Sequence, residues 1–190
     1  MGKLRVISGK AKGRKLASVP GKITRPITDR VKEALFNIIS VDIRDSSMLD
    51  LFAGTGSVGI EALSRGAKFV RFIDKHRLAI KTINSNLETT KLSNWAETLL
   101  VDAFTLLDSK SDRQFDYVFI APPQYKGLWI RALQTLDNNI NWLADGAWII
   151  VQIDPIEDKE IQLINLVEFD RRKYGSTLLI FMEFIGKNGE

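Results

Sequence analysis

Hydrophobic residues recur along most of the chain with the periods of short strands and amphipathic helices. Apolar runs of strand length lie at residues 48–52, 69–73, 98–101, 117–120 and 147–153. Helical spacing separates several of them, at residues 57–65, 78–87 and 128–136. Strands that alternate with helices predict βαβ units, and therefore an α/β fold with a mostly parallel sheet.

Both ends of the chain depart from this alternation. Thr28 is placed as an N-cap ahead of apolar residues spaced i, i+3, i+4, i+7 and i+8, which predicts a helix with one buried stripe. Near the C-terminus, residues 161–169 and 177–185 are expected to form strands joined through residues 171–175. No helix fits between them, so the sheet is expected to end in an antiparallel pair.

Basic residues are concentrated at the N-terminus. Residues 1–30 hold nine lysines and arginines against Asp29 alone, although the net charge of the chain is only +4. Apolar residues interrupt this run, which predicts a basic arm or hairpin over residues 1–27, packed on a domain of residues 28–190. Such an arm suits contact with a polyanion such as a nucleic acid, and a solvated tail is the alternative. The candidate nucleic-acid contacts are Arg5, Lys10, Lys12, Arg14 and Arg25.

Missing residue types limit the chemistry. The sequence has no cysteine and one histidine, His76, so a disulfide, a thiolate metal site or a cysteine nucleophile is excluded and no metal is expected. No apolar run reaches the about 18 residues that span a bilayer, and the first thirty residues lack a signal-peptide core. We therefore expect a cytoplasmic protein without membrane segments.

A glycine-rich turn follows the first expected strand and opens a helix. Gly54, Gly56 and Gly59 have the spacing of a dinucleotide-binding loop, and Asp74 ends the next strand, where a carboxylate can hold a ribose. Asp50, however, places a carboxylate where a dinucleotide would place its pyrophosphate, which is unfavourable. The amino group of S-adenosylmethionine is a cation and suits this carboxylate.

S-adenosylmethionine is therefore the expected cofactor, with a dinucleotide or a glycine turn that binds nothing as alternatives. Asp102 follows the third strand, where it could accept from an adenine amino group or simply cap a helix. The expected cofactor contacts are Asp50, Phe52, Gly54, Gly56, Ser57, Asp74, Asp102 and Ala103.

A proline pair follows the fourth expected strand. Proline has no N–H, so the loop leaves carbonyl groups that can accept from the exocyclic amine of a flipped base. Tyr125 could stack on such a base, or could be an ordinary surface aromatic. The candidate catalytic residues are Ala121, Pro122, Pro123, Gln124 and Tyr125.

Longer stretches carry a more specific likeness. Residues 24–37 read TRPITDRVKEALFN, residues 50–57 read DLFAGTGS and residues 61–67 read EALSRGA; residues 5–9, 13–14 and 174–177 add to them. Together these resemble the RsmD-type family of 16S ribosomal RNA guanine-N2 methyltransferases. The resemblance implies a seven-stranded class I methyltransferase fold and S-adenosylmethionine as methyl donor. It also implies a substrate of small-subunit ribosomal RNA or a 30S assembly particle, and we expect a monomer.

The chain departs from that family at the proline pair. The family has Asp or Asn before the prolines and an aromatic residue after them, whereas this chain has Ala121 and Gln124. Losing a hydrogen-bond acceptor at a reacting amine costs on the order of 10²–10³ in rate. Two interpretations follow: an enzyme that uses backbone carbonyls, Gln124 and Tyr125, or an RNA-binding ribosome-assembly protein that keeps the cofactor pocket but has little catalysis.

Overall fold

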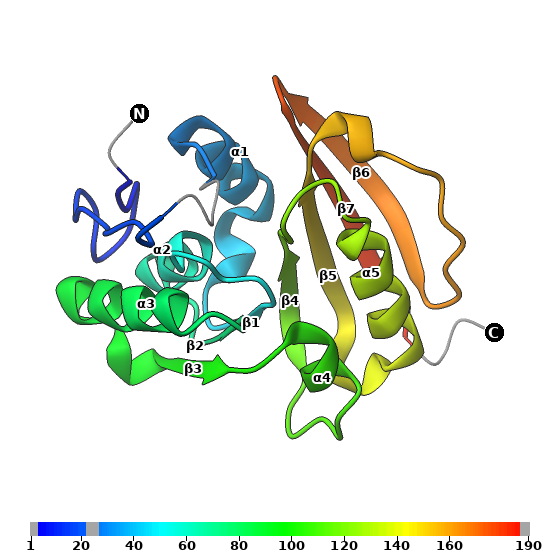
Figure 1. The fold of residues 1–190 in the computed structure, drawn as a ribbon, viewed down its shortest axis with the longest axis horizontal. Coiled ribbons are helices and arrows are strands. Elements are labelled where there is room, and N and C mark those ends of the chain that lie inside the picture. The colour runs from blue at the N-terminus through cyan, green and yellow to red at the C-terminus, as the bar shows by residue number, and fades with distance from the viewer. Residues whose placement is uncertain (1–3, 22–26, 187–190) are drawn as a thin grey trace. The chain divides into compact units, whose positions relative to one another are not determined.

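The structure, a computed structural model, describes residues 4–21 and 27–186 (Figure 1). The helices are α1 (Asp29–Ile39), α2 (Ser57–Arg65), α3 (Arg77–Thr90), α4 (Ala103–Leu107) and α5 (Leu128–Asn138). The strands are β1 (Ser47–Asp50), β2 (Phe69–Asp74), β3 (Ala96–Leu100), β4 (Phe115–Ile120), β5 (Leu143–Ile153), β6 (Leu166–Tyr174) and β7 (Thr177–Phe184). Short 3-10 helices are η1 (Ser40–Ile43), η2 (Ser93–Trp95), η3 (Ile140–Trp142) and η4 (Pro155–Glu157).

The seven strands follow the order β3-β2-β1-β4-β5-β7-β6. Strand β2 pairs in parallel with β1 and β3, and β4 pairs in parallel with β5. Strand β7 pairs antiparallel with both β5 and β6. The expected mostly parallel sheet with a terminal antiparallel pair is confirmed.

The chain divides into two units, Met1–Val101 and Asp102–Glu190. In the first unit, the hydroxyl of Thr28 accepts from the N–H of Val31 at 3.4 Å, so α1 begins as expected. Helices α2 and α3 pack on the strands of this unit (Figure 1). All four residues of β1 are buried. The separate arm predicted over residues 1–27 stays a prediction.

In the second unit, β5 lies between β4 and β7. Helix α5 buries Trp129, Leu133 and Leu136 along one stripe. The indole of Trp142 stacks on Phe115 at a centroid distance of 6.4 Å and donates to the carbonyl of Leu107 at 3.1 Å. Stacked aromatic side chains are therefore part of the core of this unit. Among the described residues, no helix is long and apolar enough to cross a membrane.

The C-terminal pair differs from the prediction in its position. Strand β6 begins at Leu166, so the first half of the predicted strand 161–169 is wrong. The predicted connection through residues 171–175 is also wrong, because β6 continues to Tyr174 and the turn is formed at Gly175 and Ser176. Gly175 has a φ of 59°, which a tight turn between antiparallel strands requires. Charge alone does not end a strand on an exposed face.

A buried carboxylate explains why residues just before β6 do not pair as a strand. Asp137, at the end of α5, is 4% exposed. Its oxygens accept from the backbone N–H groups of Ile164 at 2.8 Å, Asn165 at 2.7 Å and Leu166 at 3.1 Å. The side chain of Asn165 donates back to the carbonyl of Asp137 at 2.9 Å. These bonds use the backbone donors that a strand would need.

Replacing Asp137 should therefore destabilise the protein markedly. Asp137→Ala leaves the N–H groups of Ile164, Asn165 and the buried Leu166 without this acceptor, and we expect the free energy of unfolding to fall by about 3 kcal/mol. Urea denaturation followed by circular dichroism measures this change. The exposed Asp145→Ala serves as control, with an expected change within about 0.5 kcal/mol. Equal losses in the two variants would contradict the anchoring role of Asp137.

Candidate functional site

The glycine turn joins β1 to α2 within the first unit. Gly54 and Gly56 have φ values of 54° and 74°, in the left-handed region that favours glycine. A Cβ atom on Gly59 would lie 2.3 Å from Cε1 of Phe72, so α2 packs directly on β2. Each of the three glycines is therefore needed for a steric reason, and Gly54 and Gly56 present backbone without side chains.

Asp74 holds this turn in place. Its Oδ2 accepts from the N–H of Gly54 at 3.0 Å, and its Oδ1 accepts from the N–H of His76 at 2.8 Å. Phe52, before the turn, is half-buried, and Ser57, at the start of α2, is buried. The structure thus brings these predicted residues to one turn, while their contact with a cofactor stays a prediction.

Asp50 is a buried carboxylate with incomplete compensation. It ends β1 and is 2% exposed. It accepts from the backbone N–H of Gly59, but its Oδ1 has no hydrogen-bond partner among the described residues. Burial raises the pKa of Asp50 to about 7; the negative charge of Asp74 adds to the rise, and the bond from Gly59 opposes it. An ionisable group in this state is typical of a binding site for a cation.

Asn86 is a contact of the turn that the sequence analysis missed. It lies on α3 and is 1% exposed. Its Nδ2 donates to the carbonyl of Thr55 at 3.0 Å, and its Oδ1 accepts from the N–H of Ala17 at 2.7 Å. Asn86 therefore connects the glycine turn to the N-terminal segment. The available signal was an amide among the apolar positions of a helix.

The N-terminal segment forms a short antiparallel hairpin. Arg5 and Lys15 form an isolated antiparallel bridge. The N–H of Val6 donates to the carbonyl of Arg14 at 2.9 Å, and the N–H of Gly13 donates to the carbonyl of Val6 at 2.9 Å. This pairing gives the basic residues fixed positions along the two sides of the hairpin.

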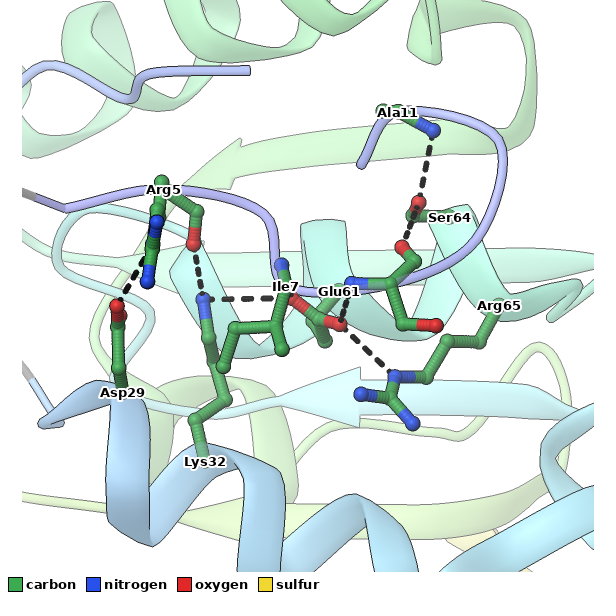
Figure 2. A network of polar contacts seen from close by, with 9 residues as sticks. Arg5, Ile7, Ala11, Asp29, Lys32, Glu61, Ser64 and Arg65 are labelled. Carbon is green, nitrogen blue, oxygen red and sulfur yellow. Dashed lines mark hydrogen bonds and ion pairs between the residues drawn. The ribbon is translucent and has the colours of Figure 1, made fainter. Parts of the chain in front are cut away.

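Glu61 attaches this hairpin to α2, as Figure 2 shows. The carboxylate is fully buried and accepts from the N–H groups of Ile7 at 2.8 Å and Ser8 at 2.9 Å. It also pairs with Arg65 at 2.8 Å and with the buried ammonium of Lys32 at 3.4 Å. Burial lowers the pKa of Lys32, and the charge of Glu61 opposes that shift.

The structure describes four of the five predicted RNA contacts. Arg5 pairs with Asp29 at 2.9 Å, which compensates part of its charge. Arg25 lies outside the described residues. The remaining candidates are exposed on the hairpin: Lys10, Lys12 and Arg14. Their contact with RNA stays a prediction.

In the second unit, Asp102 acts as a helix cap. Its Oδ1 accepts from the N–H of Phe104 at 3.0 Å at the start of α4, and Ala103 beside it is buried. The guanidinium of Arg131 lies 3.8 Å from the ring centroid of Phe104. Capping is thus the observed role of Asp102, and an additional contact with adenine stays a prediction.

The proline loop follows β4 and is connected to the segment around η4. Tyr125 has a φ of 62° and is 67% exposed. Its N–H donates to Oε1 of Glu157 at 2.7 Å, and its hydroxyl donates to Oδ2 of Asp154 at 3.0 Å. Pro122 is buried and Pro123 is exposed, with Ala121 and Gln124 half-buried. The catalytic role of this loop stays a prediction.

Comparison with known proteins identifies the family. Residues 4–183 match the family model described as Conserved hypothetical protein 95. The chain belongs to this family. One relative is ribosomal RNA small subunit methyltransferase D of Escherichia coli strain K12, 39% identical over 151 residues, covering 80% of this chain and 75% of that protein. The predicted resemblance to RsmD-type proteins is confirmed.

Solved structures agree with this family assignment. An Escherichia coli structure provisionally named as the methyltransferase yhhF has a TM-score of 0.85 at 33% identity, covering 96% of this chain and 98% of that chain. An RNA methyltransferase from Salinibacter ruber, in complex with S-adenosyl-L-homocysteine, has a TM-score of 0.65 at 13% identity, covering 87% and 97%. The second likeness concerns the fold alone. Both support the class I methyltransferase fold of the family.

The raised pKa of Asp50 predicts a specific pH dependence of stability. The folded protein holds this proton up to about pH 7, whereas in an unfolded chain the pKa of an aspartate carboxyl has its ordinary value of 3.8. The free energy of unfolding therefore falls as pH rises through this window, by about 2.5 kcal/mol between pH 5 and pH 8 from this group. Asp50→Asn removes this titrating group. The free energy of unfolding of the variant, relative to that of the unmodified protein, should therefore rise by the same amount between pH 5 and pH 8.

Urea denaturation at pH 5 and pH 8 measures the difference between the two proteins. Asp108→Asn removes an exposed carboxylate and is the matched control. Its free energy of unfolding should differ from that of the unmodified protein by the same amount at both pH values. A constant difference for Asp50→Asn as well would show that Asp50 is not protonated in the folded protein.

Proposed function

We propose that this protein transfers the methyl group of S-adenosylmethionine to the exocyclic N2 amine of a guanine in small-subunit ribosomal RNA. The observation that carries this proposal is Asp50, a buried carboxylate whose Oδ1 has no partner among the described residues, beside a glycine turn with left-handed backbone. Family membership supports it, since relatives are named as small-subunit ribosomal RNA methyltransferases.

The residues present fit this cofactor. A buried carboxylate without a cation suits the amino group of the methionine moiety, and the bare backbone at Gly54 and Gly56 permits close approach. Asp74 has lone pairs beyond its two backbone bonds for a ribose hydroxyl. We assign Asp102 and Ala103 to the adenine side. The bound cofactor supplies an electrophilic methyl group on a sulfonium, and the chain binds and orients it.

Positioning of the guanine falls to the proline loop in this proposal. Ala121 offers no side-chain oxygen, so the acceptors for the base amine are the backbone carbonyls of residues 121–123 and the amide of Gln124. Tyr125 supplies an exposed ring that can stack on a base, and Asp154 already fixes its hydroxyl. We infer that the substrate is the RNA itself or a 30S assembly particle, bound in the cytoplasm by a monomer.

The alternatives are less well supported. A pyrophosphate beside Asp50 and Asp74 meets two carboxylates, which disfavours a dinucleotide. The described residues contain no group of three or more histidine, aspartate or glutamate side chains that could hold a metal. An RNA-binding protein with little catalysis would explain Ala121, but relatives named as methyltransferases favour the enzyme.

Transfer of tritiated methyl groups to immature 30S particles tests the proposed function. We expect label in small-subunit RNA, recovered as N2-methylguanosine after nuclease digestion. Asp50→Asn should bind S-adenosylhomocysteine about 10-fold more weakly in calorimetry, because a charge-assisted contact is lost. Asp108→Asn is the control. Cofactor binding without labelled RNA would contradict the enzyme and leave the RNA-binding interpretation.

Restoring the missing acceptor should accelerate the reaction. Ala121→Asp places a carboxylate before the proline pair, and we expect single-turnover methyl transfer to rise by about 10²-fold. Ala121→Leu, which has similar volume and no oxygen, is the matched control and should give no increase. An unchanged rate in Ala121→Asp would show that the backbone carbonyls or Gln124 already complete the acceptor set.

A further inference from the structure

One exposed tryptophan of the first unit has no part in the proposed cofactor chemistry. Trp95, in η2, is 43% exposed, and the Nζ of Lys10 lies 5.6 Å from its ring centroid. We propose that Trp95 and Lys10 form a binding site for one unpaired RNA nucleotide, with the base stacked on the indole and the phosphate paired with the ammonium. This inference rests on the proposed function in taking RNA as the ligand.

Lys10 is held in position by its backbone. Its N–H donates to the carbonyl of Ser64 on α2 at 2.8 Å. The N–H of Ala11 donates to Oγ of Ser64 at 2.9 Å, and that hydroxyl donates to the carbonyl of Ser8 (Figure 2). A Cβ on Gly9 would lie 1.9 Å from the Ser64 carbonyl oxygen, so the turn lies directly against α2. A cation on a fixed turn loses little backbone entropy on binding.

The charges on the hairpin that carries Lys10 favour a polyanion. Lys12, Arg14 and Lys15 are exposed on the same hairpin as Lys10. The carboxylate nearest in the chain, Glu97, pairs with Arg71 at 2.6 Å, which reduces its repulsion of a phosphate. A cation beside an exposed aromatic ring is a combination that binds single-stranded nucleic acid, and the hairpin adds further positive charge.

The other tryptophans are more buried than Trp95 and serve in packing. Trp129 and Trp142 are 1% and 2% exposed and fill the core of the second unit. Trp148 is half-buried and packs against Phe169 at a centroid distance of 4.7 Å. Trp95 instead is 43% exposed, with the Lys10 ammonium over its ring. Since stacking accepts any base, this site adds affinity for RNA and does not select the methylated guanine.

Binding of a twelve-residue oligouridylate, followed by tryptophan fluorescence, tests this site. We expect quenching in the unmodified protein, because a stacked base quenches Trp95. Trp95→Leu should weaken binding by about 10-fold and remove most of the quenching, and Trp95→Phe should lie between them. Lys10→Gln should reduce the salt dependence of oligouridylate affinity by the contribution of about one phosphate contact.

Matched controls separate this role from folding. Phe169→Leu replaces an aromatic that is also 43% exposed but lies in the second unit, and Lys110→Gln removes an exposed cation there. Both should bind oligouridylate like the unmodified protein. The Trp95 and lysine variants should keep their urea midpoints, and every variant should keep its affinity for S-adenosylhomocysteine. A loss of binding in Trp95→Leu that is matched by Phe169→Leu would overturn the assignment.

The site is also overturned if the unmodified protein does not bind oligouridylate, or if Trp95→Leu binds it without loss. Oligouridylate contains no guanine, so it cannot accept the methyl group. Failure of methyl transfer to 30S particles therefore contradicts the proposed function and leaves the stacking result intact. Stacking that fails while methyl transfer succeeds contradicts this inference alone.

Discussion

A carboxylate removed from water must be compensated by cations or N–H groups, and two carboxylates of the first unit meet this requirement differently. Glu61 is fully buried and has two backbone donors, Lys32 and Arg65 around it. Asp50 is nearly as buried, yet one of its oxygens has no partner among the described residues. Glu61 therefore stabilises the fold, whereas Asp50 has a buried oxygen that a cationic ligand can bind.

Packing around the glycine turn explains why one oxygen of Asp50 is buried without a partner among the described residues. Gly59 lets α2 approach β2, and this approach brings the Gly59 N–H to Asp50 while burial raises the pKa of its carboxyl to about 7. Asp74 and Asn86 hold the turn from β2 and α3. The proline loop offers no side-chain acceptor at Ala121, so in the proposed reaction the backbone carbonyls and Gln124 position the amine.

The basic N-terminal hairpin is attached to its unit by side chains that a solvated tail would not need. Glu61 binds its first strand, Ser64 binds its turn and Asn86 binds the residues that follow. Glu61 and Ser64 lie on α2, the helix that follows the glycine turn. Asn86 also donates a hydrogen bond to the carbonyl of Thr55 in the glycine turn. The same elements thus support the proposed cofactor contacts and the proposed RNA contacts. This shared support gives the basic residues the fixed geometry that a stacking site requires.

Local pattern alone determined the alternation of strands and helices, the Thr28 cap, the bounds of α2 and the glycine turn, because periodicity, capping and left-handed glycines act over a few residues. Tertiary structure decided the rest. The start of β6 depends on Asp137, which binds backbone groups 27 to 29 residues away. Asn86 joins Ala17 across 69 residues, and no local period encodes such a pairing. The charge state of Asp50 likewise depends on burial, which the packing of separate elements creates.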